Sequence, residues 1–308
     1  MKLLELFKKD NIGEAPWTYR HLINLEESEY PKYLKKIFYY RTEEDLPLKR
    51  EKGKFIINKN KLKTFNQKLQ WIKLYGVTPL MRDCTDKVNV RNYISNQVGE
   101  QYLKPVLQIC KSFDEIEWEK LPDKFVLKCN HGCKWHCIVK DKQKLLLNKQ
   151  ALEVAKSKMT GWLEQEFWPW EGFELNYHGI EPKILIEPFM PANRYIEIYC
   201  FNGIPKIYSD IQLKDERKIC TYNEDFSYSD LVLKKDDEKF MCKFNADDIL
   251  KQAGKFSKQL AEDFKFVRVD WIVFEDKLYF EELTFTPYSG FSDFGKAWNE
   301  KLGDYIEI

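Results

Sequence analysis

The chain has 308 residues, of which 44% are hydrophobic and 15% aromatic, so it is long enough to bury a sizeable core. Its 50 basic and 49 acidic residues give a formal net charge of +1, and this balance argues against a general role in binding nucleic acid or a membrane surface. No apolar run in the sequence reaches the length needed to span a bilayer.

The N-terminus and the cysteines indicate where the protein works. Residues 1–17 contain only a short apolar patch, interrupted by Glu5, and they lack the apolar core and cleavage site of a signal peptide. The eight cysteines lie mostly inside apolar segments, which is typical of reduced thiols in a core rather than of a disulfide framework. We therefore expect a cytoplasmic protein without a transmembrane segment.

Helical spacing dominates the first quarter of the chain. Residues 1–80 are rich in Lys, Leu, Tyr and Glu, and Pro31 and Pro47 divide them, so they predict a helical N-terminal region. A further helix is predicted to begin at Asp86, which is a suitable N-cap, and to end at Gly99.

A strand that ends in a lysine and leads into a glycine-containing turn is the first feature that suits phosphate. The strand FVLK ends at Lys128, the turn NHGCKWH spans residues 130–136, and the strand HCIV follows. The lysine would supply a point charge, and backbone N–H groups of the turn would cradle phosphate oxygens. The turn does not match the P-loop pattern, and an ordinary hairpin with an exposed lysine explains the same residues.

Cysteine and histidine are dense in this segment, which raises the question of a zinc site. The spacing of Cys129, Cys133 and Cys137 is not CxxC, and strand alternation points Cys137 and His136 to opposite faces. We expect core thiols here rather than metal ligands.

The strand KILIEPFM, residues 183–190, places Glu187 in an apolar setting near its end. Together with backbone groups near Phe189 and Met190, this glutamate would suit the edge of an adenine ring. A glutamate exposed to solvent at the end of a strand is the alternative.

The next elements complete the chain up to its last hairpin. Residues 194–210 predict a hairpin that turns at Asn202-Gly203. Residues 207–240 are polar and predict a loop or an irregular hairpin, and residues 247–264 predict a helix.

Residues 266–287 place charges inside an apolar run. The pattern predicts two strands joined by a tight turn at Glu275-Asp276. Alternation groups the following residues on one face of each strand: Arg268, Asp270 and Ile272 on the first, and Phe280, Glu282 and Thr284 on the second.

Charges in the middle of hydrophobic strands are costly unless something pairs with them. A hard divalent cation between Asp270 and Glu282, with Arg268 beside a phosphate, would satisfy all three side chains. A structural salt bridge among these residues, or an exposed sheet face, is the alternative.

Taken in this order, these segments resemble the ATP-grasp superfamily, and more closely its TupA-like branch. That branch is named for teichuronopeptide biosynthesis and is commonly found with surface-polysaccharide genes. The resemblance covers about residues 63–295. The stretches that carry it are FNQKLQWIKLYG, TDKVNVRNYISNQVGEQYLKPVL, SFDEIEWEKLPDKFVLKCNHG, KILIEPFM, YCFNGIPKI and FVRVDWIVFEDKLYFEELTFTPYSGF.

The resemblance implies an α+β fold, the ATP-grasp fold, in which two subdomains grip ATP between them. The ATP-grasp domain would cover residues 81–308. Its lid subdomain would lie at about residues 120–186, and its C-terminal metal-binding subdomain at about residues 187–308. Residues 1–80 would then take the place of the usual first α/β domain.

The resemblance assigns the phosphate and lid residues. Three cations are expected to contact phosphate: Lys87 and Arg91, in a D-K-x-x-x-[KR] pattern, and Lys128. The lid loop falls on residues 130–135 and begins with Asn130, His131 and Gly132. It departs from the family pattern, because Cys133 and Lys134 stand where serine and glycine are typical.

The resemblance also assigns the base and metal residues. The adenine hinge falls on Glu187, Phe189 and Met190, and Glu197 is the candidate for the ribose hydroxyls. The magnesium ligands fall on Asp270 and Glu282. In place of the asparagine of an E-x-N pattern stands Thr284, whose hydroxyl coordinates Mg²⁺ more weakly than an amide oxygen.

The implied activity is ATP-dependent ligation of a carboxylate to an amine through an acyl phosphate. Arg268, Lys128 and Arg91 would neutralise charge during phosphoryl transfer. The branch suggests a uronic acid or amino-acid carboxylate in the biosynthesis of capsule or other surface polysaccharide.

Two alternatives stay open: a kinase of ATP-grasp type acting on a sugar or small molecule, and a non-catalytic nucleotide-binding protein. The resemblance does not identify the acid, the amine or the oligomeric state. The candidates for lining a carboxylate site are Arg82, Arg194, Tyr288 and Ser289.

Overall fold

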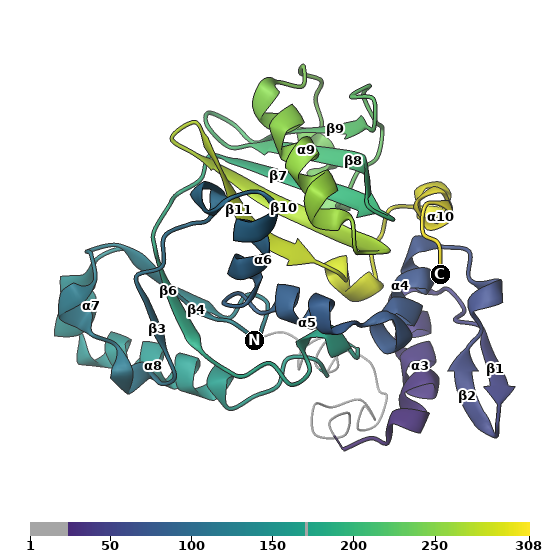
Figure 1. Ribbon diagram of the computed structural model, residues 1–308, viewed down its shortest axis with the longest axis horizontal. Coiled ribbons are helices and arrows are strands. Elements are labelled where there is room, and N and C mark those ends of the chain that lie inside the picture. The colour runs from purple at the N-terminus through teal and green to yellow at the C-terminus, as the bar shows by residue number, and fades with distance from the viewer. Residues whose placement is uncertain (1–23, 170–171) are drawn as a thin grey trace.

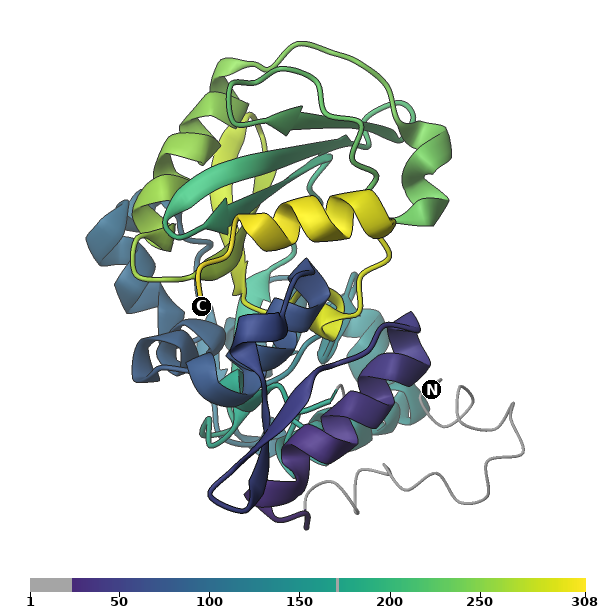
Figure 2. The same ribbon diagram turned by 90° about the vertical axis from the view of Figure 1, so that its right-hand side faces the viewer.

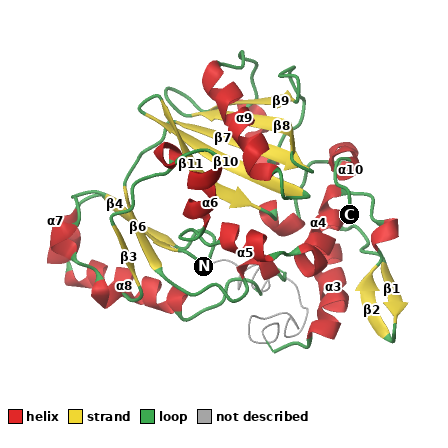
Figure 3. Cartoon of the chain, viewed as in Figure 1, coloured by secondary structure: helices red, strands yellow, loops and turns green. Residues whose placement is uncertain are grey.

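Two antiparallel β-sheets form the framework of the protein (Figure 1). The computed structural model describes residues 24–169 and 172–308, so the predictions for residues 1–17 lie outside the described residues. The five-stranded sheet has the order β11-β10-β7-β8-β9, and the four-stranded sheet has the order β3-β6-β4-β5. Helices pack on both sheets, and the architecture is α+β as expected (Figure 3).

The described N-terminal part contains a β-hairpin as well as helices (Figure 2). The spacing predicts a purely helical region, and this prediction is wrong. The Lys52-Gly53 turn has left-handed backbone angles that suit a two-residue hairpin loop. The elements are α3 (Tyr30–Thr42), β1 (Leu48–Glu51), β2 (Lys54–Ile57), α4 (Phe65–Trp71) and a π-helix (Ile72–Gly76). A capping box between Thr64 and Gln67 begins α4.

Two short helices connect this part to the four-stranded sheet. They are α5 (Pro79–Thr85) and α6 (Val90–Gln97). The predicted helix start at Asp86 is wrong, because the side chain of Asp86 accepts from the N–H of Val88 in a turn and α6 begins four residues later. Gly99, with φ of 112°, follows the end of α6 as expected.

The four-stranded sheet is covered by α8, whose buried residues share a core with the strands. The two strands predicted around the glycine turn are present as β4 and β5. The elements of this unit are β3 (Gln108–Cys110), β4 (Phe125–Cys129), β5 (His136–Val139), α7 (Lys142–Leu147), α8 (Lys149–Leu163) and β6 (Ile184–Pro188).

The five-stranded sheet carries the largest core, and α9 packs against β7, β8 and β10. Asn202 and Gly203 both have positive φ, so the predicted hairpin turn is confirmed. The elements are β7 (Arg194–Phe201), β8 (Ile204–Gln212), β9 (Lys218–Asn223), α9 (Asp248–Ala261), β10 (Phe266–Phe274), β11 (Lys277–Thr284) and α10 (Lys296–Asp304).

For residues 207–240, the first half forms a hairpin, as one of the two alternatives predicts, and the loop alternative is wrong there. β8 continues to Gln212 and pairs with β9 in a regular register. Residues Ile219, Cys220 and Tyr222 of β9 are buried, and this burial offsets the polar composition of the segment.

Among the residues described, no helix combines the length and the apolar character that crossing a membrane requires. The eight cysteines are free thiols, and within the described ranges no three Cys, His, Asp or Glu side chains converge as metal ligands.

Candidate active site

A β-bulge in the hairpin β10–β11 decides which charged residues share a face. Arg268 and Asp270 of β10 lie opposite Thr284 and Glu282 of β11, respectively.

Beyond Asp270 the register shifts by one residue, so that Trp271 pairs with Phe280. Phe280 packs on Trp271 in the core, and the predicted face that groups Phe280 with Glu282 is therefore wrong. The additional residue is Glu281, which turns toward the other sheet.

Arg268 and Asp270 form a bidentate ion pair in a buried setting. The distances are 2.7 Å from Nε to Oδ1 and 2.5 Å from Nη2 to Oδ2, and each residue is less than 10% exposed. The hydroxyl of Thr284 donates to Glu282, whose carboxylate is 3.9 Å from Arg268. The salt-bridge alternative is thus present in the structure, whereas an exposed sheet face is excluded by burial.

A third carboxylate lies beside Asp270 on the next strand of the same sheet. Glu197 on β7 lies opposite Asp270 on the other side from Glu282, so three adjacent strands each contribute one acidic residue. Burial raises the pKa of Asp270, while the Arg268 guanidinium opposes that rise.

This donor set fits Mg²⁺. Mg²⁺ is usually held by one or two carboxylates together with substrate phosphates, rather than by a complete cage of protein ligands. Asp270 and Glu282 are cross-strand neighbours of that kind, and Thr284 adds a hydroxyl beside them.

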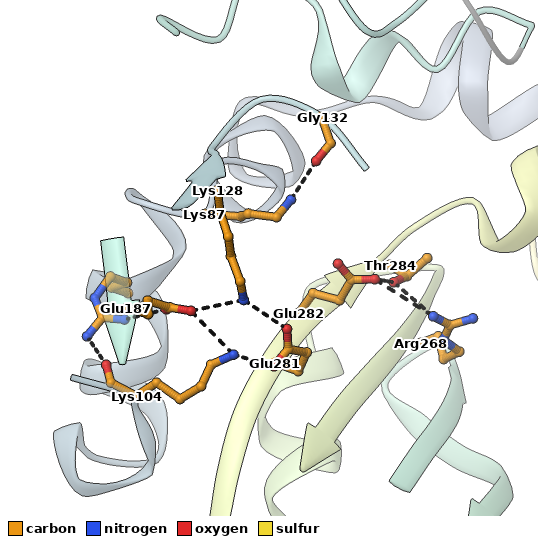
Figure 4. A network of polar contacts seen from close by, with 10 residues as sticks. Lys87, Lys104, Lys128, Gly132, Glu187, Arg268, Glu281, Glu282 and Thr284 are labelled. Carbon is orange, nitrogen blue, oxygen red and sulfur yellow. Dashed lines mark hydrogen bonds and ion pairs between the residues drawn. The ribbon is translucent and has the colours of Figure 1, made fainter. Parts of the chain in front are cut away.

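A second charged cluster joins the two sheets (Figure 4). Lys128 on β4 lies 2.9 Å from Glu187 on β6 and 3.1 Å from Glu281 on β11. Lys104 contacts the same two carboxylates. We call these four residues the junction cluster.

The charges of the junction cluster reinforce one another. Although burial opposes the shift, Lys104 and Lys128 lower the pKa of Glu281 to about 2. Glu281 and Glu187 likewise raise the pKa of Lys128 against the effect of burial. The Arg91 guanidinium lies 3.8 Å from Glu187 and donates to the carbonyl oxygen of Lys104.

Sequence reasoning missed half of this cluster. Glu281 was visible as a charge in an apolar strand, and Lys104 lies between apolar residues in YLKPVL, which was the available signal. Glu187 is only 5% exposed, so the alternative of a glutamate in solvent is wrong.

The free space beside the junction cluster is about 30 Å³, which is room for a water molecule but not for an adenine ring. Phe189 and Met190, the other expected hinge residues, are half-buried at the end of β6. The Phe189 N–H donates to the carbonyl oxygen of Lys124, and Lys140 lies over the Phe189 ring.

The turn after β4 is held by its own polar side chains. Asn130 is fully buried, donates to Asp86 and accepts from the N–H of Lys183. His131 is also buried, with its ring against the carbonyl oxygens of Trp162 and Gln165. These side chains therefore hold the shape of the turn.

Lys87 bridges to the same turn. Its ammonium donates to the carbonyl oxygen of Gly132 at 2.8 Å, while Cys133, Lys134 and Trp135 form the part of the turn that lines an adjoining cleft.

That cleft has a volume of about 820 Å³ and is lined by both sheets. A volume of this size is typical of a site for a nucleotide-sized ligand. The expected site residues that line it are Lys87, Lys128, Glu197, Arg268, Glu282 and Thr284.

The four candidates for a carboxylate site separate into two groups. Tyr288 and Ser289 line the cleft. Arg194 instead makes a buried ion pair with Asp210 and reaches Asp247, and Arg82 is exposed.

Comparison with known families settles the relationship. A family model described as TupA-like ATPgrasp matches residues 67–307. The chain belongs to the TupA-like ATP-grasp family. The α+β ATP-grasp fold expected from the sequence is thereby confirmed.

Solved structures similar to this member of the TupA-like ATP-grasp family include three ligases. D-alanine–D-alanine ligase from Bacillus anthracis, complexed with ATP, is 19% identical, covers 65% of the chain and has a TM-score of 0.37. The L-amino acid ligase from Bacillus licheniformis is 16% identical, covers 71% and has a TM-score of 0.40. D-alanine–D-alanine ligase from Helicobacter pylori is 15% identical, covers 84% and has a TM-score of 0.40.

The chain spans 54%, 47% and 77% of the lengths of these three structures, respectively. At such low identities and TM-scores the likenesses support no argument about activity, and the assignment rests on the family match. No curated protein matches the sequence.

Proposed function

We propose that this protein is an ATP-dependent ligase that forms a carbon–nitrogen bond between a carboxylate and an amine. The observation that carries the proposal is the 820 Å³ cleft of an ATP-grasp family member, where Lys128 of one sheet meets Glu197 and Glu282 of the other. Lys87 and Lys128 come from the four-stranded side, and Arg268 and Glu282 come from β10 and β11.

The basic residues would bind the triphosphate. Lys128 and Lys87 line the cleft as point charges, and Arg91 stands behind them at the junction cluster. Asp270 and Glu282, with Thr284 and Glu197 beside them, would hold Mg²⁺. When bound, Mg²⁺ would neutralise charge on the transferring phosphoryl group.

The proposed reaction has two steps. A carboxylate oxygen of the acid attacks the γ-phosphorus of ATP, the bond to ADP breaks, and an acyl phosphate forms. The amine nitrogen then attacks the acyl carbon, the bond to phosphate breaks, and an amide and orthophosphate leave with one proton released. Arg268 and Lys128 would stabilise the negative charge that develops in both steps.

The division of the chain follows the family pattern in this proposal. Residues 81–308 would form the ATP-grasp domain, with the lid at about residues 120–186 and the metal-binding part at about residues 187–308. Closure of the turn at residues 130–135 over the cleft would exclude water, which otherwise hydrolyses an acyl phosphate.

The proposed substrate is a uronic acid or an amino-acid carboxylate in the assembly of a surface polysaccharide in the cytoplasm. The association of the TupA-like branch with such pathways supports this choice. The arginines and lysines of the cleft also suit an anionic substrate.

The test is Mg²⁺-dependent release of ADP and orthophosphate against a panel of uronic acids and amino acids, each with and without amines. The proposal requires release that depends on both acid and amine, and that is lost in Glu282→Gln. ADP without orthophosphate would instead identify a kinase. ATP binding without turnover would favour a binding protein, for which Thr284 in place of a stronger metal ligand is the supporting observation.

A further inference from the structure

A strongly basic segment of the N-terminal part has no place in the proposed reaction. Residues 49–63 contain seven cations and one acidic residue, Glu51, so they carry a formal charge of +6. The whole chain carries only +1, and its other residues together therefore carry −5. The seven cations are Lys49, Arg50, Lys52, Lys54, Lys59, Lys61 and Lys63. The near-neutral total thus conceals a separation of charge that gives the molecule one strongly positive region.

These cations belong to the hairpin of β1 and β2 and to the six residues that follow it. The hairpin lies beside α3 and apart from the two larger sheets (Figure 1, Figure 2). All seven side chains are exposed. Lysine and arginine side chains at a surface keep their charges in water, where an approaching anion meets them.

The register of the hairpin decides which side chains face the protein. Leu48 pairs with Ile57, and both pack in the core beside α3. Arg50 pairs with Phe55 on the same face. The Arg50 guanidinium and the Lys32 ammonium lie 5.0 Å and 5.1 Å from the centre of the half-buried Phe55 ring. The aromatic ring of the hairpin therefore already contacts cations of the protein itself.

The opposite face, which we call the outer face, presents charges around one apolar side chain. Lys49 pairs with Ile56, and Glu51 pairs with Lys54. Ile56 is half-buried and belongs to none of the core clusters formed by the described residues. Lys52 lies in the turn at the end of this face.

Few of these charges are neutralised by the protein. Glu51 lies 3.3 Å from Lys49. Within residues 24–169 and 172–308, the other five lysines of the segment form no ion pair. The lysines of the junction cluster, in contrast, each contact two carboxylates. Five lysines of one region thus remain available to an anion outside the chain.

The chemistry of this region suits the surface of an anionic lipid bilayer. Clusters of about four to eight basic residues bind anionic lipids, and each cation near the surface strengthens binding by about fivefold. Ile56 adds an apolar side chain among the lysines. Tyr75, which is 41% exposed, lies beside the hairpin and accepts from the N–H of Ile57 at 3.2 Å. Tyrosine, with an apolar body and a polar tip, is typical of the boundary between lipid and water.

A nucleic acid would meet a less suitable surface. Single strands bind by stacking their bases on aromatic rings, but Phe55 lies on the inner face. Arg, Asn and Gln side chains that form two hydrogen bonds with a base edge read a duplex, and the outer face carries Lys, Glu and Ile instead. The residues of the outer face therefore favour a lipid surface.

We propose that the hairpin of β1 and β2, with the lysines that follow it, docks the protein reversibly on an anionic membrane surface. The lysine ammonium groups contact lipid phosphates, and Ile56 reaches the boundary between head groups and acyl chains. Docking of this kind raises the local concentration of lipid-anchored substrates around the cleft. The inference goes beyond the proposed ligase function and does not rest on it.

The experiment measures co-sedimentation of the full chain with vesicles at physiological ionic strength. One set of vesicles is phosphatidylcholine alone, and the other contains about 30% phosphatidylglycerol. Lys52→Gln/Lys54→Gln removes two charges from the hairpin. The matched control, Lys255→Gln/Lys258→Gln, removes two charges from exposed lysines of α9.

We expect the native protein to bind the vesicles that contain phosphatidylglycerol and not those of phosphatidylcholine alone. Lys52→Gln/Lys54→Gln should weaken this binding by about tenfold or more, because two contributions of about fivefold are lost, and the control should bind like the native protein. Lys59→Gln/Lys61→Gln is an independent variant with the same expected loss. Thermal unfolding checks that each variant is folded.

Three results would overturn the inference: no binding to the phosphatidylglycerol vesicles, equal binding to both kinds of vesicle, or equal losses in the hairpin variants and the control. Single-stranded and duplex DNA are titrated under the same conditions. If DNA binds and the vesicles do not, and if Lys52→Gln/Lys54→Gln weakens DNA binding, the hairpin is a nucleic-acid surface and the membrane assignment is wrong.

Discussion

The two charged clusters of this protein use the same residue types but face different surroundings. In the junction cluster, Lys104 and Lys128 each lie between Glu187 and Glu281, and only about 30 Å³ of space is left beside them. The cluster around Arg268 opens instead on a cleft of about 820 Å³. The ion pairs of the junction cluster connect the two sheets, whereas the Arg268–Asp270 pair lies within one sheet and Arg268 also lines the cleft.

Lys128 belongs to both surroundings. It contacts the two junction carboxylates and also lines the cleft. In the proposed function, Lys128 would exchange a carboxylate for phosphate oxygens when ATP binds. The comparison therefore predicts that variants on the cleft side change turnover, and that variants on the junction side change stability.

The largest effect is expected at Glu282. Glu282→Gln keeps the side-chain shape but removes the charge that would hold Mg²⁺, and turnover should fall at least about a hundredfold. Steady-state ADP release measures the loss. Glu275→Gln, an exposed glutamate in the turn of the same hairpin, is the control and should keep native turnover. Comparable losses in both variants would contradict a specific role for Glu282.

Lys128→Met should weaken ATP binding by about tenfold to a hundredfold, because one charge-assisted contact to phosphate is lost. Isothermal titration with MgATP measures the change. Lys124→Met removes an exposed lysine just before the same strand and should bind ATP like the native protein. Native ATP affinity in Lys128→Met would show that Lys128 contributes only to the ion pairs of the junction cluster and not to ATP binding.

Glu281→Gln should act on stability rather than on turnover. It removes a carboxylate that bridges two lysines, and we expect a loss of about 1–2 kcal/mol of unfolding free energy, since the side chain is 32% exposed and partly screened by water. ATP affinity should not decrease, because Lys128 then keeps one carboxylate partner, Glu187, instead of two and turns more easily toward phosphate. Denaturant unfolding and MgATP titration measure the two quantities.

The pH dependence of the stability difference between the native protein and Glu281→Gln tests the cause of that difference. The folded-state pKa of Glu281, about 2, lies below the value of about 4.3 for a free glutamate, so its contribution is complete above pH 4.3 and is lost as the pH falls toward 2. The stability gap between the native protein and Glu281→Gln should therefore be constant near neutrality and narrow below about pH 4. A gap that stays constant down to pH 3 would show that the ion pairs with Lys104 and Lys128 are not its cause.

The smallest effect is expected at Thr284. Thr284→Asn supplies an amide oxygen, a better magnesium ligand than a hydroxyl, and should lower the Mg²⁺ concentration for half-maximal turnover by a factor of a few. Titration of turnover with Mg²⁺ measures this shift. A higher Mg²⁺ requirement would show that the Thr284 hydroxyl matters through its hydrogen bond to Glu282.

Local sequence patterns were sufficient where a turn residue or an apolar alternation defines the element. The sequence predicts hairpin turns at Asn202-Gly203 and Glu275-Asp276. Both are confirmed, since all four residues occupy the left-handed backbone conformations that two-residue hairpin loops use. Residues 207–240 left a loop and an irregular hairpin as alternatives, because the polar composition around β9 conceals residues that are buried in the folded sheet. The predicted helix start at Asp86 is wrong because the Asp86 side chain accepts hydrogen bonds from the N–H of Val88, within a turn, and from the Asn130 amide.

The sequence by itself determined the family, the hairpins that turn at Asn202-Gly203 and Glu275-Asp276, and the candidate residues on β4, β10 and β11, because these depend on short patterns and on their order. The tertiary structure alone decided which charges neutralise each other and which face the cleft. Lys128 and Glu281 are 153 residues apart, and Glu174 is 115 residues from Ser289. Contacts over such separations depend on how two sheets and a bulge are placed in space, and no local periodicity encodes that placement.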